Sequence, residues 1–150
     1  MTTTTSDNPH ASEEATANSC YAKLEGDDLL LAESGEPAPA MATRVHDALR
    51  ALILDPEYPC VGSRSALNQG SYRFAMYDEL ASPEATAGLA RDLYTFIQEQ
   101  PSIEGEFTTF IACFDRPKSI TPEDFEALLW TQLKALSELD PAEWAGGIQQ

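Results

Sequence analysis

Four side chains near the middle of the sequence have chemistry beyond that of a hydrophobic core: His46, Cys60, Arg64 and Arg73. His46 shares a helical face with apolar residues three and seven positions later, so we expect its imidazole to point into the interior or along its edge. Arg73 lies between two aromatic residues, where it is either a surface side chain or an anion clamp. Cys60 and His46 also have plain structural interpretations, as a buried small residue and a core histidine.

Several well-known sites are absent from the sequence. There is no phosphate-binding GxxxxGK[ST] loop and no dinucleotide-binding GxGxxG. In "GSRSA", Arg64 stands where a nucleophile elbow needs serine. The three cysteines form no CxxC and the two histidines are far apart, which argues against a disulfide framework, a zinc module or an iron triad.

The net charge of the chain restricts the kinds of partner that it can bind. The 150 residues carry a formal net charge of −16, with the acidic residues spread over the whole chain. A surface of this kind repels nucleic acid and anionic membranes, and it is typical of salt-adapted proteins. We find neither a signal peptide nor an apolar run that would span a bilayer, so we expect a cytoplasmic protein without nucleic acid or membrane partners.

Three helices and two strands are expected from periodicity and from start signals. The first helix has its apolar stripe at Met41, Val45, Leu49 and Leu52 and ends before Pro56. The second starts at Ser82 and Pro83 and has its stripe at Leu89, Leu93, Phe96 and Ile97. The third starts at Thr121 and Pro122, with Phe125, Leu128, Leu129, Leu133 and Leu136 as its buried stripe. The two strands are expected at residues 71–77 and 106–114.

The order of elements is therefore helix, Pro-Cys loop, strand, helix, strand, helix, which predicts an α/β (α+β) fold with helices packed on a small sheet. Two strands leave the sheet edges open, so we expect the sheet to be incomplete and to need further chain or a partner subunit. Residues 1–20 read as a disordered acidic tail and 21–37 as a poorly defined acidic lead-in. The domain proper is expected at 38–144, with a short tail at 145–150.

The stretch "YPCVGSRSALNQGSYRF" resembles the signature of the YqcI/YcgG family: aromatic-Pro-Cys, a loop of small residues, then Arg-aromatic thirteen positions after the cysteine. The later segments "FTTFIACF" and "FEALLWTQLKAL" match as well, so the resemblance covers about residues 38–144. Relatives in this family continue beyond the last helix with more strand-like sequence. We therefore expect this chain to be a shortened member.

The resemblance implies a cofactor and a reaction. Family members with an assigned activity, including the pre-guanitoxin N-hydroxylase, are haem-dependent N-oxygenases. They use haem b and dioxygen as monooxygenases that hydroxylate a guanidine or amine nitrogen of an arginine-like substrate. Carried over to this sequence, His46 is the expected axial ligand of the haem iron and Cys60 is the rival ligand. Arg64 and Arg73 are possible propionate contacts on chemical grounds alone, because a planar guanidinium clamps a carboxylate.

Two other hypotheses remain open. In the first, the chain is a non-catalytic remnant that acts as an interaction or assembly module. It would form a homo-oligomer or bind a partner that completes the sheet. Alternatively, Cys60 would be a redox sensor, which requires a lowered thiol pKa.

Overall fold

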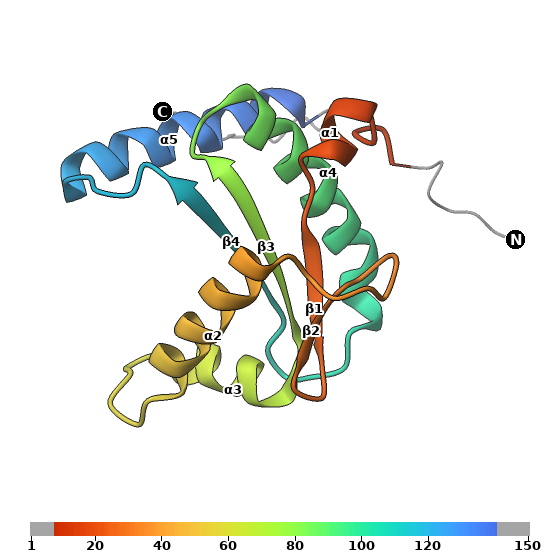
Figure 1. Ribbon diagram of the computed structural model, residues 1–150, viewed down its shortest axis with the longest axis vertical. Coiled ribbons are helices and arrows are strands. Elements are labelled where there is room, and N and C mark those ends of the chain that lie inside the picture. The colour runs from red at the N-terminus through yellow and green to blue at the C-terminus, as the bar shows by residue number, and fades with distance from the viewer. Residues whose placement is uncertain (1–7, 141–150) are drawn as a thin grey trace, which may run out of the picture.

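The computed structural model describes residues 8–140 and contains a four-stranded mixed sheet flanked by helices. The strands are β1 (Tyr21–Glu25), β2 (Asp28–Leu31), β3 (Tyr72–Glu79) and β4 (Thr109–Arg116), in the spatial order β2-β1-β3-β4. β1 pairs antiparallel with β2 and with β3, whereas β3 and β4 run parallel. The α+β class expected from the sequence is confirmed (Figure 1).

The helices cover both faces of the sheet. They are α1 (Glu13–Ala17), α2 (Ala40–Leu54), α3 (Val61–Gln69), α4 (Pro83–Glu99) and α5 (Pro122–Leu139), with a 3₁₀ turn at Gln100–Ser102. One core cluster joins α2 and α3 to one face of the sheet, and a second joins α4 to the other face. Figure 1 shows α2 and α3 apart from α4 and α5, with the strands between them.

Strand β3 is the centre of the molecule, and alternate residues of it serve the two faces. Tyr72 and Phe74 enter the cluster beneath α2 and α3, whereas Ala75 and Tyr77 enter the cluster beneath α4. All four side chains are buried. Because β3 is paired on both sides and covered on both faces, it fixes the position of every helix that packs on the sheet.

The helix start signals in the sequence are confirmed. The Ser82 hydroxyl accepts a hydrogen bond from the amide of Ala85 at 3.0 Å, and the Thr121 hydroxyl accepts one from the amide of Asp124 at 3.1 Å. Each satisfies one of the amides that a helix start leaves without an intrahelical partner.

The N-terminal part differs from the expected tail and lead-in. Residues 13–17 form α1, and residues 21–31 form a hairpin that supplies two of the four strands. Gly26 lies between these strands with φ of 64°, a backbone angle that favours glycine at a tight turn. The hairpin is stable because Ala22 and Leu29 are buried against the sheet and its helices, a contact that local composition does not reveal. Residues 1–7 and the expected tail at 145–150 lie outside the described residues.

The expected Pro-Cys loop is partly helical, which corrects the sequence analysis. α3 begins after Cys60 and ends at Gly70, whose φ of 67° is the left-handed conformation that commonly closes a helix. Gly62, Ser63 and Ser65 lower its helix propensity, so the segment reads as a loop in the sequence. Burial of Ala66 and Leu67 in the core compensates for this.

The buried stripe expected on α5 is only partly correct, because Leu128, Leu129 and Leu136 are half-buried and the other two members are exposed. Phe125 is 46% exposed and Leu133 is 43% exposed, and the one buried side chain of the helix is Gln132. The Gln132 amide accepts a hydrogen bond from the amide of Ala81 at 2.9 Å and donates one to the Thr86 hydroxyl at 2.8 Å. α5 is therefore attached to the start of α4 through polar contacts, with Leu136 packed on the apolar cluster nearby.

The other two stripes are each only partly buried. On α2, Met41 and Leu52 are exposed, whereas Val45 and Leu49 pack against the core. On α4, Leu89 is buried but Ile97 is exposed. On α2 the buried residues are Ala42, His46 and Ile53, so the face turned to the core lies one position beyond the expected stripe. On α4 the exposed Ile97 lies near the helix end.

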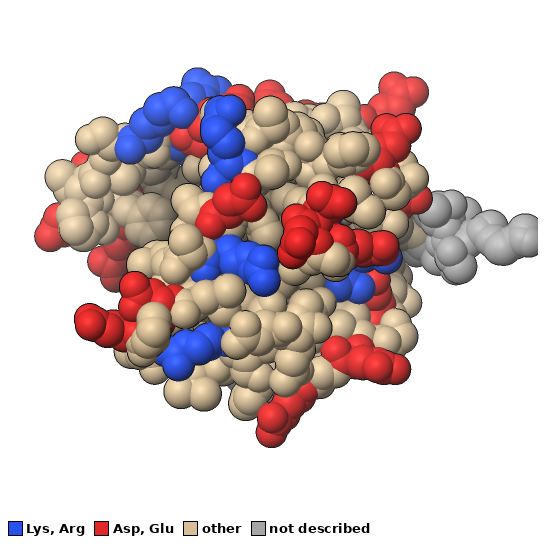
Figure 2. All heavy atoms as spheres, turned by 60° about the horizontal axis from the view of Figure 1, so that its bottom comes forward, with Lys and Arg blue, Asp and Glu red and all other residues tan. Residues whose placement is uncertain are grey.

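The surface charges are dispersed. Figure 2 shows acidic side chains scattered over one face of the molecule, with basic side chains between them. This arrangement agrees with the even spread of acidic residues along the sequence.

Candidate functional site

The signature stretch, residues 58–74, runs from the turn after α2 through α3 to the start of β3, and Cys60 lies near its beginning. The cysteine is the N-cap of α3 and is exposed to solvent. Its sulfur accepts hydrogen bonds from the Ser63 hydroxyl at 3.2 Å and from the Ser63 amide at 3.4 Å. A sulfur thus occupies the place that a serine or aspartate oxygen usually takes at a helix start.

These contacts change the acidity of the thiol. The hydrogen bonds from Ser63 lower the pKa of Cys60 below its ordinary value. Burial instead raises the pKa of Cys20 and that of Cys113. Cys60 therefore has the most thiolate character of the three cysteines, which is the form that attacks electrophiles and binds metals.

Arg64 binds the backbone of the chain itself. One of its terminal nitrogens donates to the carbonyl oxygens of Asp55, Pro56 and Tyr58, with distances of 3.5 Å and 3.3 Å for the first two. The guanidinium therefore holds the turn between α2 and α3 in place. All three bonds use the same terminal nitrogen, and the buried Nε of Arg64 has no hydrogen-bond partner.

His46 lies in the interior, as expected from its place on α2, and is 2% exposed. Its Nε2 lies 2.6 Å from the hydroxyl of Tyr72, and its ring packs against Tyr72 and Phe74. Its Nδ1 is buried without a hydrogen-bond partner, 3.6 Å from a carboxylate oxygen of Asp47. Burial lowers the pKa of His46, so the imidazole is neutral at pH 7.

Arg73 is on the opposite face of the sheet from His46. Its Nε and Nη2 donate to the two carboxylate oxygens of Glu99 at 3.2 Å and 2.7 Å, the two-pronged geometry that arginine favours. Glu99 also accepts a hydrogen bond from the Tyr21 hydroxyl at 2.6 Å. Burial alone would raise the pKa of Glu99, but the bonds from Arg73 and Tyr21 outweigh it and hold that pKa below its usual value.

The four expected site residues are therefore not brought together. Tyr72, the partner of His46, precedes Arg73 in β3, and successive side chains of a strand point to opposite faces. Both arginines have internal partners in place of haem propionates. Among the described residues, no group of three His, Cys, Asp or Glu is placed to hold a metal ion.

These positions show how the described residues would fit the expected haem. His46 does not fit an axial ligand in this arrangement, because Nε2 is bonded to Tyr72 and the ring is enclosed by aromatic side chains. Cys60 does present a free, exposed sulfur. Of the two rival ligands, the residues present thus fit the thiol and not the imidazole.

Sequence reasoning missed a second polar cluster, centred on Asp92 of α4. The buried carboxylate accepts hydrogen bonds from the hydroxyls of Ser19 and Tyr77, and Arg91 pairs with it at 3.3 Å. Burial raises the pKa of Asp92. A signal was available, since an adjacent arginine and aspartate interrupt the apolar stripe of α4.

The structure can now be compared with known proteins. The model of the YqcI/YcgG family matches residues 49–150, more than half of the chain. The chain belongs to the YqcI/YcgG family. A Bacillus subtilis (strain 168) protein with the name "Uncharacterized protein YqcI" is 29% identical over 100 residues, which cover 63% of this chain and 38% of that relative. No solved structure matches.

The YqcI/YcgG match divides the candidate residues into two groups. Cys60, Arg64 and Arg73 lie inside the matched range, whereas His46 and the β1–β2 hairpin precede it. The chain spans well under half the length of the curated relative, whose remaining part has no counterpart in the match. In the part of the chain that the structure describes, no helix has both the length and the apolar character needed to cross a membrane.

Proposed function

We propose that this YqcI/YcgG chain is an assembly module that binds a further part of a YqcI-type fold along strand β4. The observation that carries the proposal is the position of Phe125. It shares one face of α5 with Gln132 and Leu136, since seven and eleven positions are close to two and three helical turns. Gln132 is buried and Leu136 packs on the core, yet Phe125 is exposed.

The exposure of Phe125 follows from where α5 begins. Figure 1 shows the first turns of α5 projecting past β4, on the side away from β3. β4 is the edge strand there, and its apolar residues are only partly buried. Parallel strands are normally interior and covered on both faces. One more strand beside β4 would pair its free edge and lie beneath Phe125.

The proposed occupant is an apolar strand from the portion of a YqcI-type polypeptide that lies outside the matched region. That portion is more than half of the curated relative, so it contains enough chain for additional strands. A second copy of the present chain is the competing occupant, because an edge strand is also able to pair with itself.

The test mixes the full chain with the part of Bacillus subtilis YqcI that follows the matched region. We expect a one-to-one complex by light scattering coupled to size exclusion. Phe125→Asp should weaken the complex at least about 30-fold, as for loss of an interface residue worth about 2 kcal/mol. The control is Trp130→Asp, on another side of the same helix and exposed like Phe125, which should leave binding unchanged.

Two results would contradict the proposal. A homodimer of the chain alone that is lost in Phe125→Asp would identify a second copy as the occupant. No association in either experiment would remove the assembly role altogether.

The second candidate function is the haem-dependent N-oxygenase implied by the family resemblance, acting on an arginine-like nitrogen with dioxygen. The observation that favours it is the exposed Cys60 with its lowered pKa inside the family match. A thiolate-bound haem supplies oxygen activation, since the thiolate favours O–O cleavage. Here the residues of this chain would hold the cofactor through Cys60, and the hydrogen bonds from Ser63 would favour its thiolate form.

This second function is tested by absorbance after haem reconstitution. A Soret band that is lost in Cys60→Ala and kept in His46→Gln would support haem binding through the thiol. Loss of the Soret band in His46→Gln, but not in Cys60→Ala, would instead identify the imidazole as the ligand. If neither the chain alone nor the mixed complex shows a Soret band, haem binding is excluded.

A further inference from the structure

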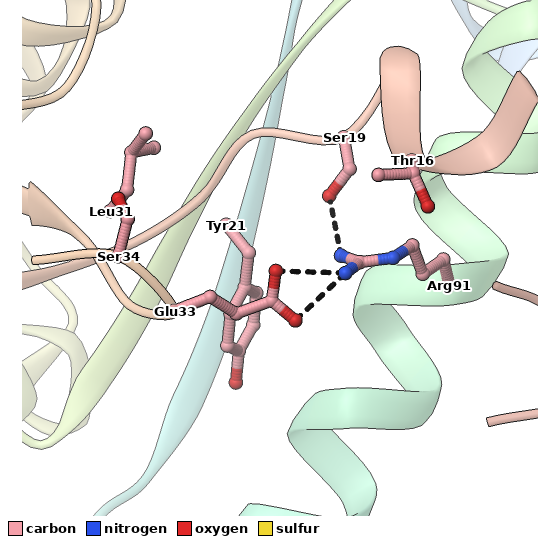
Figure 3. A pocket seen from close by; sticks show the side chains of 7 residues that line it. All are labelled: Thr16, Ser19, Tyr21, Leu31, Glu33, Ser34 and Arg91. Atoms are coloured by element: carbon pink, nitrogen blue, oxygen red, sulfur yellow. Dashed lines mark hydrogen bonds and ion pairs between the residues drawn. The ribbon is translucent and has the colours of Figure 1, made fainter. Parts of the chain in front are cut away.

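A small cavity of about 180 Å³ lies between α1, the segment after β2, and α4 (Figure 3). Four hydroxyl-bearing residues line it, together with Glu33 and Arg91: Thr16, Ser19, Tyr21 and Ser34. All but Arg91 precede the family match, so the cavity is separate from the signature stretch. A pocket with several hydroxyls around a guanidinium is suited to an anion with oxygen atoms.

Arg91 is the fixed part of this cavity. The residue is 8% exposed, and its Nη1 donates to the hydroxyl of Ser19 at 3.0 Å and to Asp92 at 3.3 Å. Its Nε is buried and has no hydrogen-bond partner. A buried donor without an acceptor is unfavourable, so one edge of this guanidinium is incompletely satisfied.

Glu33 is the lining residue of the cavity that a ligand could displace from Arg91. Both of its carboxylate oxygens accept from Nη2 of Arg91, at 2.8 Å and 2.7 Å, as drawn in Figure 3. The strongest arginine–carboxylate geometry uses two nitrogens in parallel, and Glu33 uses only one. The Glu33 side chain is 50% exposed, so it can turn into solvent, and an ion pair with this exposure is weak.

We propose that this cavity binds a small carboxylate, which displaces Glu33 and pairs with Nε and Nη2 of Arg91. The cavity is small and partly open to solvent, which suits a small acid. Thr16 and Ser34 also line the same space. A carboxylate is favoured over phosphate because Asp92 lies beside Arg91 and repels a doubly charged anion more strongly.

Binding of the carboxylate would also release the segment after β2 from α4. Glu33 at present links that segment to α4, and its carboxylate competes for Arg91 as an internal ligand at high effective concentration. Acetate should therefore bind weakly to the native chain. Removing the charge of Glu33 should strengthen the binding.

The test is a titration of the full chain with sodium acetate at constant ionic strength, followed through the amide NMR signals of Ser19 and Ser34. Glu33→Gln should bind acetate about two- to fivefold more tightly than the native chain, the factor expected when a half-exposed ion pair is lost. The matched control is Glu36→Gln, which removes one negative charge from an exposed position of the same segment and should not change the affinity.

Arg91→Lys keeps the charge but lacks the planar two-nitrogen edge, and should abolish the shifts. Equal acetate affinity in Glu33→Gln and Glu36→Gln would overturn the proposal, and this comparison remains decisive if the Arg91 variant does not fold. Tighter binding of inorganic phosphate than of acetate would overturn the assignment to a carboxylate.

Discussion

The hydroxyl of Tyr72 lies 2.6 Å from Nε2 of His46, and the two rings stack with only 13° between their planes. The pair joins α2 to β3 across 26 positions of sequence, in the interior of the molecule. It gives the buried imidazole a polar partner and a packing surface together. His46 therefore has a clear structural role in this chain.

Removal of the Tyr72 hydroxyl should destabilise the fold. In Tyr72→Phe the imidazole nitrogen is left buried without a partner, which should lower the free energy of unfolding by about 1–3 kcal/mol. Urea unfolding followed by circular dichroism measures the change. Tyr94→Phe, at a half-buried tyrosine elsewhere in the structure, should change stability by less than about 0.5 kcal/mol. Equal effects would show that the hydrogen bond is not important.

The neutral state of His46 should make the protein sensitive to mild acid. Burial lowers its pKa from the ordinary value of 6.5, so below pH 6.5 the unfolded chain takes up a proton that the folded chain resists. The free energy of unfolding should therefore fall as the pH drops below 6.5, and level off below the folded pKa.

Comparison of unfolding at pH 7.5 and pH 5.5 measures this contribution. His46→Gln should reduce the difference between the two pH values, whereas His10→Gln should not. Identical pH dependence in the native chain and in His46→Gln would contradict the assignment.

Cys60 should be the most reactive of the three cysteines. Its lowered pKa and its exposure favour attack on iodoacetamide near pH 7, whereas burial raises the pKa of Cys20 and Cys113. Mass spectrometry of the alkylated peptides gives the three rates. Ser63→Ala removes the hydroxyl that bonds the sulfur, so alkylation should shift to higher pH. An unchanged pH profile in Ser63→Ala would show that the hydroxyl does not set the pKa.

Substitution of glycine by alanine should have opposite effects on stability at two positions. A Cβ at Gly88 would overlap the backbone carbonyl of Asn18 and lie 3.3 Å from the ring of Tyr77, so Gly88→Ala should cost about 1–3 kcal/mol. At Gly62 the nearest atom would be 3.7 Å away, on the ring of Phe107. Gly62→Ala should therefore stabilise α3 by about 0.5–1 kcal/mol. Thermal unfolding of both variants measures the difference, and equal signs would refute it.

The sequence predicts the parts of this fold that depend on local signals. Ser82 and Thr121 mark helix starts by the chemistry of their hydroxyls, and both are confirmed. The hairpin was missed because its stability depends on burial against distant residues. α3 was missed because a cysteine sulfur is an uncommon cap.

The candidate site was harder to predict than the fold. The spacing of Cys60, Arg64 and Arg73 identifies the family, yet β3 directs Arg73 away from the face that holds His46. Gln132 shows a related limit. A polar residue within an apolar stripe reads as exposed, but here hydrogen bonds to Ala81 and Thr86 bury it.

The β1–β2 hairpin has a practical consequence for work on related proteins. It supplies half of the strands in the sheet but precedes the family-matched range of 49–150. A recombinant fragment cut at the matched range would expose both long edges of the β3–β4 pair and would also divide α2. Such a fragment should aggregate on expression through its uncovered strand edges. Expression boundaries should therefore be placed before residue 13, ahead of α1.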